Sequence, residues 1–434
     1  MAAAAPAGTG RWFGFGFNRF GQTINSVERP GSPVKREADD RVLEPREVTV
    51  CNSRPNRSDV PPPRSGLELR AAQPEADDGT GPNPRRRVSP CRVSPAWSHS
   101  ACLTDDGSIH FWGFAADVPW RQMYLNSQGL RGCRDILSSE KYLLTLWQDR
   151  VECWDIPSLC RTGEASDAVI WQKHLQEEEK PNAAFPLIPG GYITTTPPFY
   201  KSLSPPLLGA RKLVLGSEHA LLLTCDWTVY SWGAGRHGQL GHGGVEDEAD
   251  PRIVEALHGL VVTELAAGAW HSVCSSASGD LYVWGWNESG QLGLPARSCS
   301  GEEHQKPSER IGFSGEGTPI LCDAGDTVQK STTEKATMGN MNVFISIQAF
   351  PALLDLPGEL EISRVSCGSR HTAAVTRSGQ LFTWGWGSYG QLGHGQTLST
   401  DLPRRVEYFM RKQLYVLDVV CGPWNTFVFA HEKD

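Results

Sequence analysis

The sequence predicts an all-β fold in which small sheets recur along the chain and close into a ring, a β-propeller. A pattern that runs from G-x-x-H through W-G to G-Q-L-G is repeated in three stretches, residues 215–243, 268–293 and 367–395. The marker histidines of these units are separated by 52 and by 100 residues: His219, His271 and His371. A period of about 50 residues is typical of propeller blades and solenoids. The 45 glycines and 15 tryptophans among 434 residues also suit blades of Gly- and aromatic-rich strands.

The last of these units shows why each repeat forms a small sheet. After His371, residues 372–375 have the period-two alternation of a strand. Residues 377–379 (R-S-G) supply a tight turn, and residues 380–384 (Q-L-F-T-W) favour a second strand. Trp384 and its equivalents are large apolar plates, so one unit cannot bury its apolar face alone. Units must therefore pack side by side, and closing the ring protects their edges.

The two ends of the repeat region each carry half of a unit. Residues 11–22 (R-W-F-G-F-G-F-N-R-F-G-Q) match the second half of a unit, and residues 421–429 match the first half, with Asn425 in the histidine position. Two half-units at opposite ends predict one blade that both ends complete. Such a blade ties the ring shut and removes two free sheet edges.

The remaining units are less regular. Residues 91–113 keep the marker spacing between His99 and Trp112, whereas residues 136–154 are a degenerate copy without the histidine or the usual Gly turn. The predicted units lie near residues 91–113, 136–154, 205–243, 255–294, 350–395 and 405–430. Together with the half-unit at 11–22, they predict a propeller domain over 91–434 with six blades, one of them shared.

Two segments differ in composition and are predicted to be disordered inserts. Residues 23–90 contain eleven prolines from Arg29 onward, near-balanced charges and few aromatic residues, which is too little apolar surface to offset the entropy of ordering. Residues 296–342 are rich in Gly, Ser, Thr and charge and contain no Trp. The basic residues at 35–36 and 85–87 are either nuclear-import or phosphate contacts, or solvated linker charge.

The composition and motifs argue against catalysis. The chain has no G-K pair for a phosphate-binding loop, and its twelve cysteines form no C-x-x-C pair. A histidine that recurs in the same slot of several units (His99, His219, His271 and His371) is better explained as a structural residue than as a catalytic one. No metal, cofactor or enzymatic activity is therefore expected. No apolar run of 18 residues is present, so we expect a soluble intracellular protein without membrane contact.

One apolar segment outside the repeats is a candidate partner-binding site. Residues 184–193 (A-F-P-L-I-P-G-G-Y-I) lie in a long stretch without repeat matches. The segment either packs on the propeller or presents a peptide to a partner. The candidate contact residues are Phe185, Leu187, Ile188 and Tyr192.

The G-x-x-H-[TSA] strand, the S-G-x-[LV]-[YF]-x-W-G strand and the G-Q-L-G turn resemble the repeats of the regulator of chromosome condensation family. The resemblance covers most of residues 91–434 and the W-F-G-F-G-F motif within 11–22. It implies a β-propeller of usually seven blades. We therefore expect six to seven four-stranded blades, and a seventh would lie within 155–205.

The resemblance also implies a function. The expected role is a non-catalytic interaction scaffold, nuclear and chromosome-associated with some cytoplasmic protein, that assists a chromatin-associated partner. The implied partner is a histone-modifying oxygenase of the JmjC type, a demethylase or hydroxylase, with indirect contact to chromatin and a role in chromosome segregation. The runner-up is a guanine-nucleotide exchange factor for a small GTPase, although the founding member's wedge hairpin is not recognisable here. Direct nucleosome binding is less favoured, because the net charge of −8 opposes it.

Overall fold

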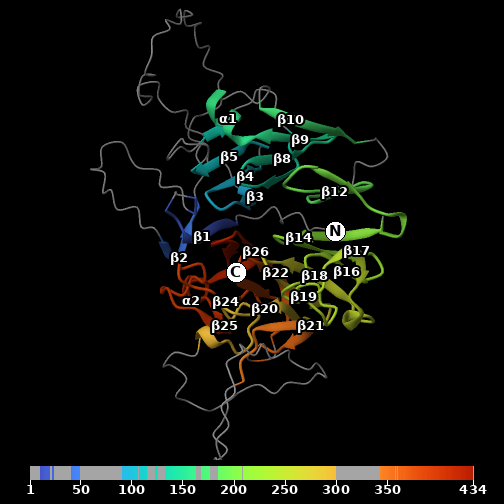
Figure 1. Ribbon diagram of the computed structural model, residues 1–434. Coiled ribbons are helices and arrows are strands. Elements are labelled where there is room, and N and C mark those ends of the chain that lie inside the picture. The colour runs from blue at the N-terminus through green and yellow to red at the C-terminus, as the bar shows by residue number, and fades with distance from the viewer. Residues whose placement is uncertain are drawn as a thin grey trace, which may run out of the picture.

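The structure, a computed structural model, describes most of the repeat region and part of the first ninety residues. The described residues are 10–19, 22–23, 41–48, 90–105, 107–114, 123–125, 132–162, 168–175, 184–207, 209–299, 343–356, 358 and 360–433. Their strands form seven antiparallel sheets that follow one another around a ring (Figure 1). The predicted all-β propeller is confirmed, and its blades number seven.

Six blades follow in chain order. The first blade contains β3 (Pro90–Pro95), β4 (His99–Thr104), β5 (Ile109–Gly113) and β6 (Met123–Leu125). The second contains β7 (Asp135–Ser138), β8 (Tyr142–Leu146), β9 (Arg150–Asp155) and β10 (Val169–His174). The third contains β11 (Leu187–Ile188), β12 (Gly191–Ile193) and β13 (Tyr200–Ser202). The fourth contains β14 (Ala210–Leu215), β15 (His219–Thr224), β16 (Val229–Gly233) and β17 (Glu248–Ile253). The fifth contains β18 (Val262–Ala267), β19 (His271–Ser276), β20 (Leu281–Trp286) and β21 (Ile347–Leu354). The sixth contains β22 (Ile362–Cys367), β23 (His371–Thr376), β24 (Leu381–Gly385) and β25 (Thr400–Arg405).

Helices are short and lie in connections between strands. Among the described residues they are α1 (Ile156–Thr162), α2 (Glu407–Arg411) and the 3₁₀ turns η3 (Pro205–Leu207), η4 (Glu255–Leu257) and η5 (Arg297–Cys299). Within the described residues, no helix has both the length and the apolar character needed to cross a membrane.

The seventh blade joins the two ends of the chain. It contains β26 (Leu414–Cys421) and β27 (Asn425–Glu432) from the C-terminal end, and β1 (Arg11–Phe17) and β2 (Arg41–Glu47) from the N-terminal end. Figure 1 shows β1, in blue, next to the red C-terminal strands. In the β1–β27 register, Phe15 pairs with Thr426 and Gly16 with Asn425. Gly16 has φ +115°, and a Cβ there would lie 2.6 Å from the Cα of Asn425, so glycine is required. The predicted shared blade is confirmed.

The predicted units hold the inner strands of each blade and omit the outermost one. For example, β21 is the outermost strand of the fifth blade. The predicted unit for that blade, 255–294, omits it, and most of β21 falls instead in the next predicted unit, 350–395. Four outermost strands carry a proline near their centre: Pro45, Pro251, Pro351 and Pro403. Proline is tolerated there because an edge strand leaves one row of N–H groups unpaired. These strands follow loops of variable length and read as polar, Pro-containing linker, which explains why the sequence did not reveal them.

The same cause makes the prediction of a disordered insert over 23–90 wrong at residues 41–47. These residues form β2, whose Val42 is buried, and Gly395 N donates a 3.0 Å hydrogen bond to Leu43 O. The remaining predicted insert residues, 24–40 and 49–89, lie outside the described residues, as do 300–342 of the second predicted insert.

The seventh blade expected within 155–205 is the third in chain order. Within the described residues it has three strands rather than four, and its sequence lacks the marker histidine and the G-Q-L-G turn. Its stability comes from packing: Ile188 and Ile193 join the apolar core shared with the second blade, and Tyr192 joins the core shared with the fourth.

The marker histidines connect successive blades. His219, His271 and His371 each place Nε2 2.9–3.0 Å from a hydroxyl in the next blade, at Ser272, Thr372 and Thr426 respectively. Each hydroxyl donates its only proton to the carbonyl oxygen of the G-Q-L-G glutamine of the preceding blade, over 2.7–2.8 Å. The histidine must therefore donate from Nε2, which fixes the neutral Nε2–H tautomer.

Two of the four other junctions follow directly from the sequence. In the fourth blade Ala220 stands in the hydroxyl position, because the third blade before it offers neither the histidine nor the glutamine carbonyl. At the junction of the shared blade with the first, Ser100 Oγ and Trp112 Nε1 donate to Gln22 O over 2.8 and 2.7 Å. Gln22 thus acts as the glutamine of the half-unit predicted at 11–22.

Charges alternate around the axis of the ring. The innermost strands contact one another from blade to blade. In six blades, the residue seven positions before the marker position is charged: Arg92, Asp135, Lys212, Glu264, Arg364 and Asp418. Glu264 pairs with Lys212 Nζ at 2.6 Å and with Arg364 Nη1 at 2.8 Å, and Arg92 pairs with Asp135 at 2.6 Å. Asp418 lies in the field of Arg364 on one side and Arg92 on the other. Among the described residues of the third blade, the N–H of Phe185 donates to Asp135 and no charged side chain joins the series. We call these six side chains the axial charge belt.

Candidate functional site

Two positions of the repeat meet at one face of the ring. The first is the residue before the marker histidine, and the second is the second residue after the tryptophan position. In the fifth blade, Trp286 N donates a 2.9 Å hydrogen bond to Trp270 O, and in the sixth, Trp386 N donates a 2.8 Å bond to Arg370 O. The same bond joins Phe17 N to Trp424 O in the shared blade. The fold therefore holds both side chains side by side at the same end of each blade.

In the fifth, sixth and shared blades these positions are occupied by aromatic residues and by Arg370, which form a surface band of two side-chain clusters. We call this band the aromatic crescent; its members are Phe17, Trp97, Trp270, Trp286, Arg370, Trp386, Tyr389 and Trp424. Trp97 is 45% exposed, Phe17 is buried, and the other members are half-buried. A contiguous apolar surface rimmed by polar groups is typical of an interaction site.

One part of the crescent lies across the fifth and sixth blades. The rings of Trp270 and Trp286 meet edge to face with centroids 5.2 Å apart. The guanidinium carbon of Arg370 lies 4.7 Å from the ring centre of Trp286 and 5.9 Å from that of Trp270. Arg370 thus fills the space beside two indole faces through cation–π contacts.

The other part extends from the sixth blade to the first. Trp386 contacts Tyr389 and Trp424 with ring centroids 4.9 and 4.8 Å apart. Phe17 lies 4.8 Å from Tyr389 and stacks on Trp97 at 6.3 Å. These rings already hold one another in place, so a partner would meet a preformed surface at little cost in side-chain entropy.

The fourth blade adds a polar rim. Glu218 accepts hydrogen bonds from Arg236 and from Trp270 Nε1, the latter over 3.3 Å. The hydrogen bond from Arg236 holds the pKa of Glu218 below its usual range. His237 packs 5.2 Å from Trp286, and burial followed by the charge of Arg236 lowers its pKa, which favours the neutral ring.

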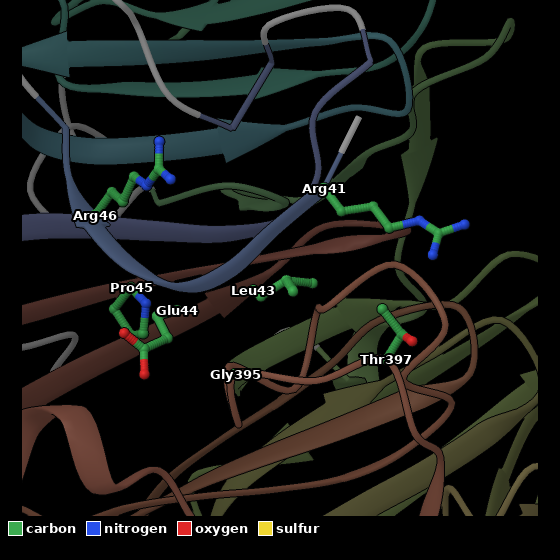
Figure 2. Close-up of a pocket in the computed structure, with 7 residues that line it drawn as sticks. All are labelled: Arg41, Leu43, Glu44, Pro45, Arg46, Gly395 and Thr397. Atoms are coloured by element: carbon green, nitrogen blue, oxygen red, sulfur yellow. The ribbon is translucent and has the colours of Figure 1, made fainter. Parts of the chain in front are cut away.

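A shallow cavity of about 660 Å³ adjoins the crescent between β2 and the loop after β24. Figure 2 shows the residues of β2 above Gly395 and Thr397, with Arg41 and Arg46 extending from opposite ends of the strand. The guanidinium carbon of Arg41 lies 5.9 Å from the ring centre of Tyr389, so this side chain lines the cavity and also contacts the crescent.

The residues that the sequence singled out for partner binding lie elsewhere, in the third blade. Ile188 and Tyr192 are 3% and 6% exposed and belong to its core. Phe185 and Leu187 are half-buried against the same core. The segment packs on the propeller, and the contact of Phe185, Leu187, Ile188 and Tyr192 with a partner stays a prediction.

The described residues contain no group of three or more His, Cys, Asp or Glu side chains placed to hold a metal ion. Burial lowers the pKa of His219 to about 4 and the pKa values of His271 and His371 to about 3, so these rings are neutral at pH 7. Each is committed to the next blade through Nε2, which fits the structural role expected for a repeated histidine.

Sequence reasoning missed the crescent although its residues stood in the aligned units. The tryptophan that most units share is buried, as in Trp284 and Trp384, and it marks the core rather than the surface. The useful signal was the opposite one: aromatic residues at positions that vary between units, such as Trp270, Trp286 and Trp386. A variable position that is aromatic in adjacent blades has no repeat-wide packing role and so points to the surface.

Comparisons with known proteins agree with this architecture. The family model described as "Regulator of chromosome condensation (RCC1) repeat" matches residues 228–275, 278–327 and 378–429, and a second model with that description matches 262–291 and 362–391. The chain is 40% identical over 440 residues to "RCC1 domain-containing protein 1" of Homo sapiens and 40% identical over 446 residues to that of Mus musculus; each match covers 98% of both chains.

A solved structure shares the fold. Prp20p from Saccharomyces cerevisiae, described with its binding properties to Gsp1p and histones, superimposes with a TM-score of 0.50 at 14% identity, over 98% of this chain and 92% of Prp20p. At that identity the likeness concerns the fold alone.

Proposed function

The chain belongs to the regulator of chromosome condensation repeat family, and from this membership we propose that it is a non-catalytic scaffold whose aromatic crescent binds a protein partner. The observation that carries the proposal is the crescent itself, a preformed aromatic band across four of the seven blades. Tryptophan, tyrosine and arginine are the residues most enriched among those that dominate binding energy at protein interfaces.

The partner in this proposal is a chromatin-associated, histone-modifying oxygenase of the JmjC type, and the complex is nuclear with a role in chromosome segregation. The support for this part is the family resemblance of the whole chain rather than any feature of the site. It also agrees with the net charge of −8, which favours reaching chromatin through a partner over direct capture of nucleic acid.

The test is a pull-down of nuclear JmjC oxygenases by the full chain and by two variants. Trp386→Ala should reduce recovery about tenfold or more, because truncating a central interface aromatic costs about 2 kcal/mol or more. Phe350→Ala is the matched control, since Phe350 is 42% exposed and lies outside the crescent. Equal recovery with both variants would remove the crescent from the proposal, and recovery of no JmjC oxygenase would remove the named partner.

The alternative is a guanine-nucleotide exchange factor for a small GTPase, a role that the family resemblance also implies. Prp20p, which shares the fold and is described with binding to Gsp1p and histones, is the reason to test this alternative. Release of a fluorescent GDP analogue from a panel of small GTPases distinguishes the two. We expect no acceleration by the purified chain; clear acceleration of one GTPase would favour the exchange factor.

A further inference from the structure

We propose that the segment of the partner that contacts the aromatic crescent is acidic and places carboxylates on Arg370 and Arg41. This inference rests on the proposed function and names the chemistry that the same site selects. The inference depends on which charged side chains of this face already have a partner within the protein and which do not.

Arg370 is a cation without an anionic partner. Its guanidinium packs on Trp286 and Trp270, but in the described part of the chain no carboxylate lies within ion-pair distance of it. Its Nε is buried and makes no hydrogen bond. Cation–π contact satisfies the face of a guanidinium, and it leaves the two terminal Nη groups, rather than the buried Nε, to meet the oxygens of a carboxylate.

Two carboxylates of the same face, Glu218 and Glu140, are already committed. Glu218 accepts from Arg236 and Trp270. Glu140 accepts from the backbone N–H groups of Trp97 and Ser98, and from Ser98 Oγ over 2.7 Å. A basic partner would have to displace these internal donors, whereas an acidic one would complete groups that are now unsatisfied.

Arg41 repeats the arrangement at the other part of the crescent. It is exposed, lies over the ring of Tyr389 and lines the cavity of Figure 2. Glu44 is the acidic residue among the residues that line this cavity, and it pairs with Arg411 at 3.0 Å. Both parts of the crescent therefore present guanidinium groups among aromatic rings.

These features favour an acidic peptide with apolar side chains over a nucleic acid. The band offers ring faces to apolar groups, and its cations are few and separated by tryptophan and tyrosine. A duplex carries a charge about every 1.7 Å and needs a broad basic surface, which a chain of net charge −8 does not supply.

The experiment uses a phage-displayed library of short random peptides, selected on the full chain and counter-screened on Trp286→Ala. Peptides that depend on the crescent should be rich in Asp and Glu together with apolar residues. Their affinity, measured by fluorescence anisotropy of the synthetic peptide, should fall about tenfold to a hundredfold with Arg370→Gln, because a charge-assisted hydrogen bond is lost. Arg252→Gln is the matched control, since Arg252 is an exposed arginine that pairs with Glu248 in β17.

A charge exchange sharpens the test. Arg370→Glu should abolish binding of the acidic peptide and restore it for a peptide in which one glutamate is replaced by arginine. Crescent-dependent peptides that are basic or neutral, or binding that survives Arg370→Gln, would overturn the inference and leave the scaffold proposal standing. A library that yields no crescent-dependent peptide would instead overturn both. A dimer of the chain alone that dissociates with Arg370→Gln would also overturn it, because a second copy would then cover the crescent.

Discussion

Replacing Thr372 by valine tests the hydrogen-bond network that joins the blades. The Thr372 hydroxyl donates to Gln291 O over 2.7 Å and accepts from His271 Nε2 over 3.0 Å, and all three residues are 0% exposed. Valine has nearly the same shape but cannot make either bond, so a carbonyl oxygen and an imidazole N–H remain buried without partners.

The expected loss follows from those two groups. A buried polar group left unsatisfied costs about 1–3 kcal/mol, so the variant should lose about 2–6 kcal/mol. That is a large part of the roughly 5–15 kcal/mol by which folded proteins are stable. Thr372→Ser is the control, because it keeps the hydroxyl and removes one methyl group, at a cost of about 1 kcal/mol.

Urea unfolding followed by tryptophan fluorescence measures both variants. The valine variant should unfold at a clearly lower urea concentration than the serine variant, with a similar dependence on urea. If the two variants unfold together, the hydroxyl does not hold the junction, and the explanation given for the marker histidines fails with it.

Three further predictions concern pH, closure and the axial charge belt. The pKa values of His271 and His371 near 3 and of His219 near 4 lie below the unfolded value of about 6.5, so their contribution is present above pH 6.5 and is lost as the pH falls toward 4 and 3. At pH 5 we expect a loss of about 2 kcal/mol for each histidine, seen as a lower urea midpoint than at pH 7; an equal midpoint would contradict the buried neutral state. Phe15→Ala should cost about 3–5 kcal/mol and raise hydrogen exchange in β27, because Phe15 is fully buried where the two ends meet; unchanged exchange would disprove the latch. Glu264→Gln should cost only about 1–2 kcal/mol by urea unfolding, since the two cations it pairs with are about a third exposed; a gain in stability would show that burial of this carboxylate outweighs both ion pairs.

The sequence revealed the closure of the ring because both half-units retain the residues that closure needs. Gly16 faces Asn425 as Gly385 faces His371, and Gln22 accepts the same bonds as the other G-Q-L-G glutamines. At these positions the repeated residue type also makes the tertiary contact, because glycine is required for steric reasons and glutamine supplies the backbone acceptor.

Other parts could not be predicted for an equally physical reason. β2 and the other outermost strands gain their stability from one neighbouring strand and need little apolar alternation, so Pro45 and its charged neighbours resembled a linker. The third blade is held by packing against blades on both sides rather than by the repeated hydrogen bonds, so it has no repeat signature. The crescent depends on which positions of different blades come together, and a single unit contains no information about that.

Because the charges of the axial charge belt alternate in sign, the pattern depends on whether the number of charged blades is even or odd. Inserting or deleting one charged blade that does not border the third blade would bring two equal charges together beside the axis, whereas gaining or losing two adjacent blades would keep opposite signs adjacent. An odd ring cannot alternate throughout, and here the mismatch falls on the third blade, which supplies a backbone N–H where the others supply a charge. Lineages of this fold that change size should therefore do so by even steps, or by a change at the uncharged blade or beside it.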